Sequence, residues 1–208
     1  MKICLIRHGE TDWNAIGMLQ GREDIPLNEN GKTQAKLCGL ALKSMTWAAV
    51  ITSPLQRARR TAEIIADALN IQEIYDDANL VERDYGKASG LVEKERTALF
   101  PDGKYEGMED WETLRDRMYK SIIQNAGKFY PDNIIIVSHG SAINSILAEL
   151  SNHEIGTGKT PLKNACINMF TYADGMLSIE FYNKAHDELL RDAGDGGIVV
   201  ESLYDTRG

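Results

Sequence analysis

The chain has 208 residues, of which 43% are hydrophobic and 26% charged, and its formal net charge is −8 at neutral pH. This size and composition predict one globular domain over residues 1–208, and the acidic balance argues against nucleic acid as a partner, because nucleic-acid-binding proteins usually present a basic face. We find no secretion-signal pattern, no apolar run long enough to span a membrane, and three widely spaced cysteines. We therefore expect no membrane association, no disulfide framework and a cytoplasmic location.

Apolar runs separated by turn residues predict strands that alternate with helices. The predicted strands cover residues 2–6, 47–52, 72–75 and 133–138. The predicted helices cover residues 29–45, 53–69, 108–129 and 141–150. Ser53 and Pro54 suit the N-cap and the first position of the second helix. This alternation predicts an α/β fold with a mostly parallel mixed sheet that is covered on both faces.

The end of the chain departs from this alternation. Residues 166–172 and 176–183 flank a short loop that contains Gly175, which predicts a β-hairpin. From about residue 191 to 208 the sequence becomes acidic and rich in glycine, and we interpret it as a C-terminal tail. Residues 198–204 within it fit either an edge strand or an interface. The exposed edge strand of the hairpin could also pair with the same strand of a second copy across a two-fold axis, so a homodimer is a further interpretation.

Charged side chains follow three of the predicted strands. Arg7 and His8 come directly after the first strand, Arg57 lies in the first turn after the second, and His139 ends the run "NIIIVSH". Ligands of parallel α/β sheets bind beyond the carboxyl ends of the strands. We therefore expect these four side chains to meet at one edge of the sheet.

A phosphate at that edge would find suitable donors. Arg7 and Arg57 offer paired N–H groups that match phosphate oxygens, and a protonated His139 could donate to a third oxygen. The helix that begins at Ser141 would direct free amide groups at the same anion, while Gly9 and Gly140 would allow close approach of the backbone.

Two further side chains suggest a reaction rather than binding alone. A neutral His8 is a competent nucleophile toward phosphorus, and Glu82, in "LVERDYG", could protonate the leaving oxygen. The four histidines lack the spacing of metal ligands, so we expect neither a metal nor another cofactor.

Four stretches, "LIRHGETDWN", "SPLQRARRTA", "ERDYG" and "VSHGSAI", together resemble the histidine phosphatase superfamily, the phosphoglycerate mutase-like proteins. The resemblance implies a three-layer α/β/α sandwich, phosphorylation of His8, a phosphate pocket completed by Arg7, Arg57 and His139, and proton donation by Glu82. It also implies a set of residues that line the substrate site, namely Asn14, Gln20, Gly21, Tyr85, Gly140 and Ser141.

The resembled family contains phosphatases and mutases. Its phosphoglycerate mutases carry a lysine eleven residues after the proton donor and an arginine pair further on. Here Glu93 occupies the first position, although Lys94 follows it, and the acid-rich stretch of residues 93–118 holds no Arg-Arg pair. We therefore expect a metal-independent phosphomonoester hydrolase that acts on a small phosphorylated metabolite.

Two alternatives remain at this point. The "ERDYG" stretch looks more like the mutases, so a cofactor-dependent phosphoglycerate mutase is the main alternative. A non-catalytic phosphate-binding module is disfavoured, because such relatives usually lack the first histidine or an arginine and this chain keeps both. α-Ribazole and sugar-phosphate phosphatases resemble the chain about equally well, so the leaving group stays open.

Overall fold

A computed structural model describes residues 1–192, so the predicted strand at residues 198–204 and nearly all of the expected tail lie outside the described residues. Within this part, one mixed sheet has the strand order β3-β2-β4-β1-β5-β6. Its strands are β1 (Lys2–Arg7), β2 (Ala49–Thr52), β3 (Ile74–Asp76), β4 (Ile134–Ser138), β5 (Ile167–Ala173) and β6 (Met176–Lys184).

The four strands β1 to β4 run parallel, and the predicted hairpin of β5 and β6 adds antiparallel strands beside β1. In the pairing of β1 with β4, Arg7 lies opposite Ser138, and Thr52 of β2 lies opposite Val137. The carboxyl ends of these three strands therefore share one edge of the sheet. Asp174 and Gly175 close the hairpin with positive φ angles of 52° and 77°, which suits a tight turn between twisted strands.

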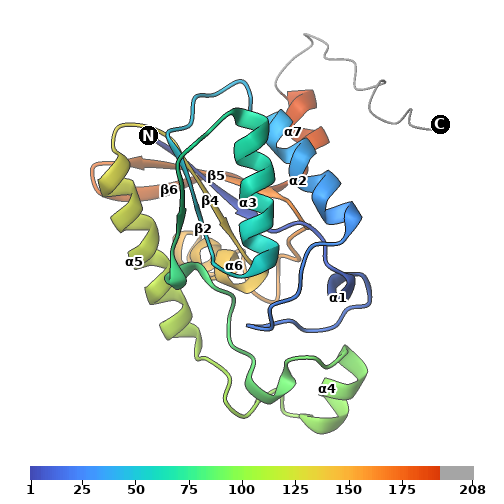
Figure 1. Cartoon of the computed structure of the whole chain (residues 1–208). Coiled ribbons are helices and arrows are strands. Elements are labelled where there is room, and N and C mark those ends of the chain that lie inside the picture. The colour runs from blue at the N-terminus through green and yellow to red at the C-terminus, as the bar shows by residue number, and fades with distance from the viewer. Residues whose placement is uncertain (193–208) are drawn as a thin grey trace, which may run out of the picture.

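Helices cover both faces of the sheet, as Figure 1 shows, which gives the expected three layers. One face carries α2 (Glu29–Ala41), α3 (Gln56–Leu69) and α7 (His186–Asp192), and the other carries α5 (Trp111–Phe129) and α6 (Gly140–Leu150). Alternate residues of β1 serve the two layers: Ile3 and Leu5 pack with α5 and α6, whereas Cys4 and Ile6 pack with α2 and α3. The short helices α1 (Asp12–Ala15) and α4 (Glu93–Leu99) belong to the connections between these elements.

Several predicted boundaries were wrong by a few residues. The helix predicted from Ser53 begins at Gln56 instead, with Leu55 at the N-cap. The Ser53 hydroxyl accepts from the Leu55 amide at 3.3 Å and lies 2.8 Å from Nε2 of His139. The helix predicted from residue 108 begins at Trp111, since Asp110 caps it by accepting from the Thr113 amide at 2.7 Å.

Boundaries around the second strand also moved. Helix α2 stops at Ala41 rather than Met45, and the Trp47 indole donates to the Leu42 carbonyl at 3.0 Å, which satisfies one of the carbonyls left free at the helix end. Strand β2 starts at Ala49 rather than at Trp47.

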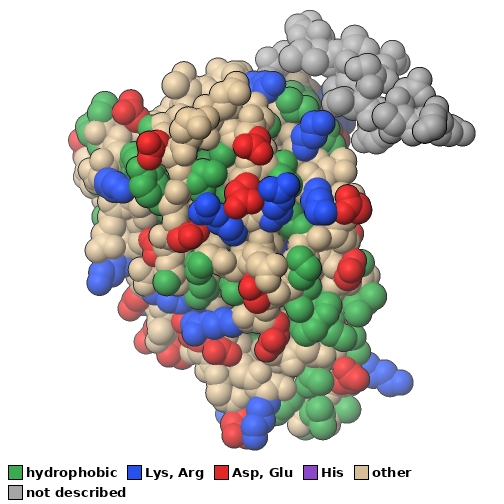
Figure 2. Space-filling model, in the orientation of Figure 1, with side chains coloured by type: hydrophobic (Ala, Val, Ile, Leu, Met, Phe, Trp, Pro, Cys, Tyr) green, Lys and Arg blue, Asp and Glu red, His purple; other side chains and the backbone are tan. Residues whose placement is uncertain are grey.

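The surface carries charges of both signs. On the face drawn in Figure 2, Lys and Arg side chains are interspersed with Asp and Glu side chains instead of forming one basic area. No helix among residues 1–192 is long and apolar enough to cross a membrane.

Ile136 lies fully buried at the centre of β4, and its replacement tests how strongly the core depends on this strand. Ile136→Ala should lower the free energy of unfolding by roughly 2–5 kcal/mol, because it removes buried methyl groups and leaves a cavity. The matched control is Leu99→Ala in α4, where the side chain is 63% exposed, and it should cost under about 0.5 kcal/mol. Urea titration measures both, and equal costs would contradict this assignment of the core.

Candidate active site

A pocket of about 290 Å³ opens at the carboxyl edge of the sheet. Its lining includes all of the predicted site residues except His139: Arg7, His8, Asn14, Gln20, Gly21, Arg57, Glu82, Tyr85, Gly140 and Ser141. The parallel register therefore brings together side chains that lie far apart in the sequence.

His8 is held in one tautomer. Its Nδ1 lies 2.6 Å from the Gly9 carbonyl oxygen, and because a carbonyl can only accept, Nδ1 must carry the hydrogen. Nε2 then carries the lone pair. Burial, followed by the charges of Arg57 and Arg7, holds the pKa of His8 well below its usual value of 6.5. The imidazole is therefore neutral at pH 7, as a nucleophile requires.

Arg57 is completely buried, and three of the five N–H groups of its guanidinium are hydrogen-bonded within the protein. It donates to the carbonyls of Glu23 at 2.6 Å and Gly21 at 2.7 Å, and its Nε donates to His139 Nδ1 at 3.2 Å. Burial lowers its pKa to about 10, so the side chain stays cationic at neutral pH. Arg57 thus ties the loop that carries Gln20 and Gly21 to the sheet edge.

The second cation at the pocket is Arg7. One of its terminal nitrogens donates to the Leu162 carbonyl, while its Nε is buried and has no partner among the described residues. With Arg57 it provides two positive charges beside His8, the arrangement that an anionic substrate would need.

His139 makes two side-chain hydrogen bonds that the sequence analysis did not predict. Since Nδ1 accepts from Arg57, Nε2 carries the hydrogen and lies 2.8 Å from the Ser53 hydroxyl. Burial and the Arg57 charge lower the pKa of His139 well below 6.5. Its ring is fully buried, with its centroid 5.2 Å from that of His8. His139 orients Arg57 from behind the pocket.

The N-terminus of α6 was also expected to bind the substrate directly. Instead, the amides of Ser141 and Ala142 donate to the Glu82 carboxylate at 3.1 and 3.0 Å. The amide of Arg83 donates to the same group at 2.9 Å. The helix end therefore fixes Glu82 at the pocket wall. Free amides at a helix N-terminus bind carboxylates in the same way as they bind phosphates.

Gly9 serves the fold rather than the ligand. A Cβ atom built at Gly9 would lie 2.4 Å from the carbonyl oxygen of Gly31 in α2, so no side chain fits between β1 and this helix. The close approach that we expected toward a phosphate occurs toward Gly31 instead.

Asn164 is a site neighbour that the sequence analysis missed. Its side-chain amide donates to Asn14 Oδ1 at 3.1 Å, and the amide of Thr11 donates to the same oxygen at 3.2 Å. These donors fix which end of the Asn14 amide is the acceptor, so its NH₂ group is left for the pocket. Asn164 lies in an irregular loop before β5 and belongs to none of the quoted motifs, so the sequence held no signal for it.

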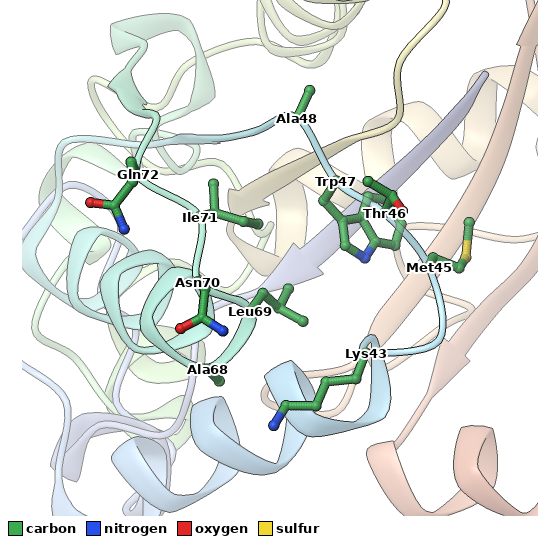
Figure 3. A pocket seen from close by; sticks show the side chains of 10 residues that line it. All are labelled: Lys43, Met45, Thr46, Trp47, Ala48, Ala68, Leu69, Asn70, Ile71 and Gln72. Atoms are coloured by element: carbon green, nitrogen blue, oxygen red, sulfur yellow. The ribbon is translucent and has the colours of Figure 1, made fainter.

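A second hollow of about 510 Å³ lies at the opposite edge of the sheet, before β2 and β3. Figure 3 shows that Trp47, Leu69 and Ile71 line it, with Lys43 as its ionisable side chain. It holds none of the predicted site residues. Elsewhere in residues 1–192, no group of three or more His, Cys, Asp or Glu side chains is placed to hold a metal ion.

Comparison with known proteins identifies relatives over most of the chain. The profile of the histidine phosphatase superfamily (branch 1) matches residues 3–185. An uncharacterized phosphatase, PhoE, of Bacillus subtilis (strain 168) is 42% identical over 182 residues, which cover 87% of this chain and 93% of the relative. A probable phosphoglycerate mutase, GpmB, of Salmonella choleraesuis (strain SC-B67) is 34% identical over 72% of this chain and 74% of its own length.

Among solved structures, Bacillus stearothermophilus YhfR superposes with a TM-score of 0.82 and 24% identity. The match covers 89% of this chain and 98% of that one. Phosphoglycerate mutase from Bacillus anthracis str. Sterne superposes with a TM-score of 0.76 and 22% identity, over 93% of this chain and 97% of that one, which confirms the predicted phosphoglycerate mutase-like α/β fold.

The two buried histidines predict a loss of stability in mild acid. His8 and His139 bind protons near pH 6.5 when unfolded but only at much lower pH when folded, so the unfolded state gains protons first as the pH falls. Between pH 6.5 and 5.5 the pair should lower the free energy of unfolding by about 2 kcal/mol. Urea titrations at both pH values measure this, and His8→Gln should remove about half of the pair's contribution. An unchanged pH dependence in that variant would contradict the burial of a neutral His8.

Proposed function

Because the chain belongs to the histidine phosphatase superfamily, we propose that it hydrolyses small phosphomonoesters through a phosphohistidine at His8, as a single domain and without a metal. The observation that carries this proposal is the His8 tautomer. Its Nε2 lone pair belongs to a neutral ring beside the buried Arg57 and the half-buried Arg7.

The first step transfers the phosphoryl group to the protein. The Nε2 lone pair of His8 attacks phosphorus, and the bond from phosphorus to the ester oxygen breaks. Arg7 and Arg57 stabilise the negative charge on the phosphoryl oxygens, with the Asn14 NH₂ group as a further donor. The leaving oxygen takes its proton from Glu82, whose Oε2 accepts one amide bond against two at Oε1 and so has room for the proton.

Water completes the cycle. Glu82, now a carboxylate, removes a proton from a water molecule whose oxygen attacks the phosphorus of phosphohistidine. The bond between nitrogen and phosphorus breaks, its electron pair returns to Nε2, and inorganic phosphate leaves. Each group is thereby restored to its starting state.

The charges of the pocket favour hydrolysis over the mutase reaction. Arg7 and Arg57 are the cations among the described lining residues, and no lysine joins them. Glu93, at the position where the resembled mutases carry lysine, lies in the exposed first turn of α4 outside this lining. A substrate with a second anionic group would therefore lack a partner for it. The relative with 42% identity is also named a phosphatase, whereas the probable mutase shares 34%.

Hydrolysis of p-nitrophenyl phosphate in the presence of EDTA tests the proposal. The wild-type protein should release nitrophenol and phosphate, and His8→Ala should abolish turnover because the nucleophile is lost. His153→Ala, on a loop outside the pocket lining, is the matched control and should keep full activity. Tight phosphate binding without turnover would support the binding module instead, and exchange of 3- and 2-phosphoglycerate with little free phosphate would support the mutase.

The role of Glu82 predicts a dependence on the leaving group. Glu82→Gln should lower kcat/KM for phenyl phosphate by about a hundredfold or more, because phenolate is a basic leaving group that needs the proton. The loss with p-nitrophenyl phosphate should be much smaller, since nitrophenolate departs without protonation. Initial rates with both esters measure the contrast, and equal losses would remove Glu82 from the role of proton donor.

A further inference from the structure

Glu82 lies in a segment that the sheet does not support. The residues from Val81 to Asp84 follow a short 3-10 turn, Ala78–Leu80, and belong to no strand. A proton donor needs a fixed position, so some other part of the molecule must hold this backbone.

Four consecutive carbonyls, those of Asn79 to Glu82, accept hydrogen bonds from side chains. Ser138, the last residue of β4, donates to Leu80 at 2.8 Å. Arg117 of α5 supplies all the others, with distances of 2.6 Å to Asn79, 2.7 Å to Val81 and 3.0 Å to Glu82.

Arg117 has no donor to spare. Its Nε and Nη2 also bind the two carboxylate oxygens of Glu109, at 2.7 and 2.9 Å, so five N–H groups meet five acceptors. Partial burial alone would raise the pKa of Glu109, but hydrogen bonds and the charge of Arg117 hold it below its ordinary value. The pair is well shielded from water, with side-chain exposures of 14% for Arg117 and 7% for Glu109.

We infer that Arg117, oriented by Glu109, is the positioning residue for Glu82, and that it sets where the proton is delivered to the leaving oxygen. This inference rests on the proposed function. The planar guanidinium is essential to this role, because the ammonium of a lysine has three donors at a single point and cannot reach three carbonyls and a carboxylate at once.

The test compares the activity toward two esters with different leaving groups. A variant that only disturbed the structure would lose activity toward both esters equally. Arg117→Lys should lower kcat/KM for phenyl phosphate by about tenfold to a hundredfold, and by less than about threefold for p-nitrophenyl phosphate. In a Glu82→Gln background the same substitution should add little to the loss with phenyl phosphate, because the group that it positions is already gone.

Arg115→Lys is the matched control. Arg115 lies on the same helix, forms exposed ion pairs with Asp116 and Glu149, and contacts nothing at the pocket. The Arg115→Lys variant should leave kcat/KM for both esters unchanged. If Arg117→Lys does not fold, as judged by circular dichroism, Glu109→Gln takes its place, since it removes the charge that orients the fork and should give the same selective loss.

The outcomes separate the two proposals. Equal losses on both esters, or losses that multiply in the double variant, would overturn the positioning role while leaving hydrolysis intact. No turnover of either ester by the wild-type protein would overturn the proposed function and this inference with it.

Discussion

The site is organised by a cation that water does not reach. Burying a guanidinium is costly unless its donors find acceptors, and Arg57 meets this demand with two loop carbonyls and His139. The need to satisfy Arg57 therefore fixes the Gly21–Glu23 loop, the tautomer of His139 and the engagement of Ser53. The same positive charge helps to keep His8 neutral, so one buried group shapes both the binding of an anion and the state of the nucleophile.

Much of this arrangement could be predicted from the sequence, because it follows from strand order. Arg7 ends the first apolar strand, His8 follows it, and Arg57 lies in the first turn of the helix after the second strand. Parallel strands bring residues at their carboxyl ends to one edge of the sheet. The contacts of His139 and of the α6 N-terminus within the protein could not be predicted in this way. Both were assigned to the substrate, but side chains from distant segments, Arg57 and Glu82, occupy the available groups. Which side chain takes a given donor or acceptor depends on distances in the folded structure, and the spacing of residues along the sequence does not give these distances.

The contacts of Arg117 could not be predicted from the sequence either. In the sequence it is one charge beside the apolar stripe of a helix, which usually indicates a solvated face. Its importance comes from an irregular segment whose carbonyls need hydrogen-bond donors. Irregular segments show no hydrophobic periodicity, so the sequence pattern does not identify them. The residues that support a site are therefore harder to predict than those that touch a substrate, although both obey the same hydrogen-bonding requirements.

The register of β1 against β4 has a consequence for how such proteins diverge. Since Arg7 lies opposite Ser138, the two histidines leave the sheet side by side whatever the length of the intervening connections. Insertions or deletions in the connections, such as the one that holds α4, need not disturb this pairing. A one-residue slip in the central strands would turn every side chain to the other layer and destroy it. Changes in the length of the connections are therefore tolerated better than changes in the register of the central strands.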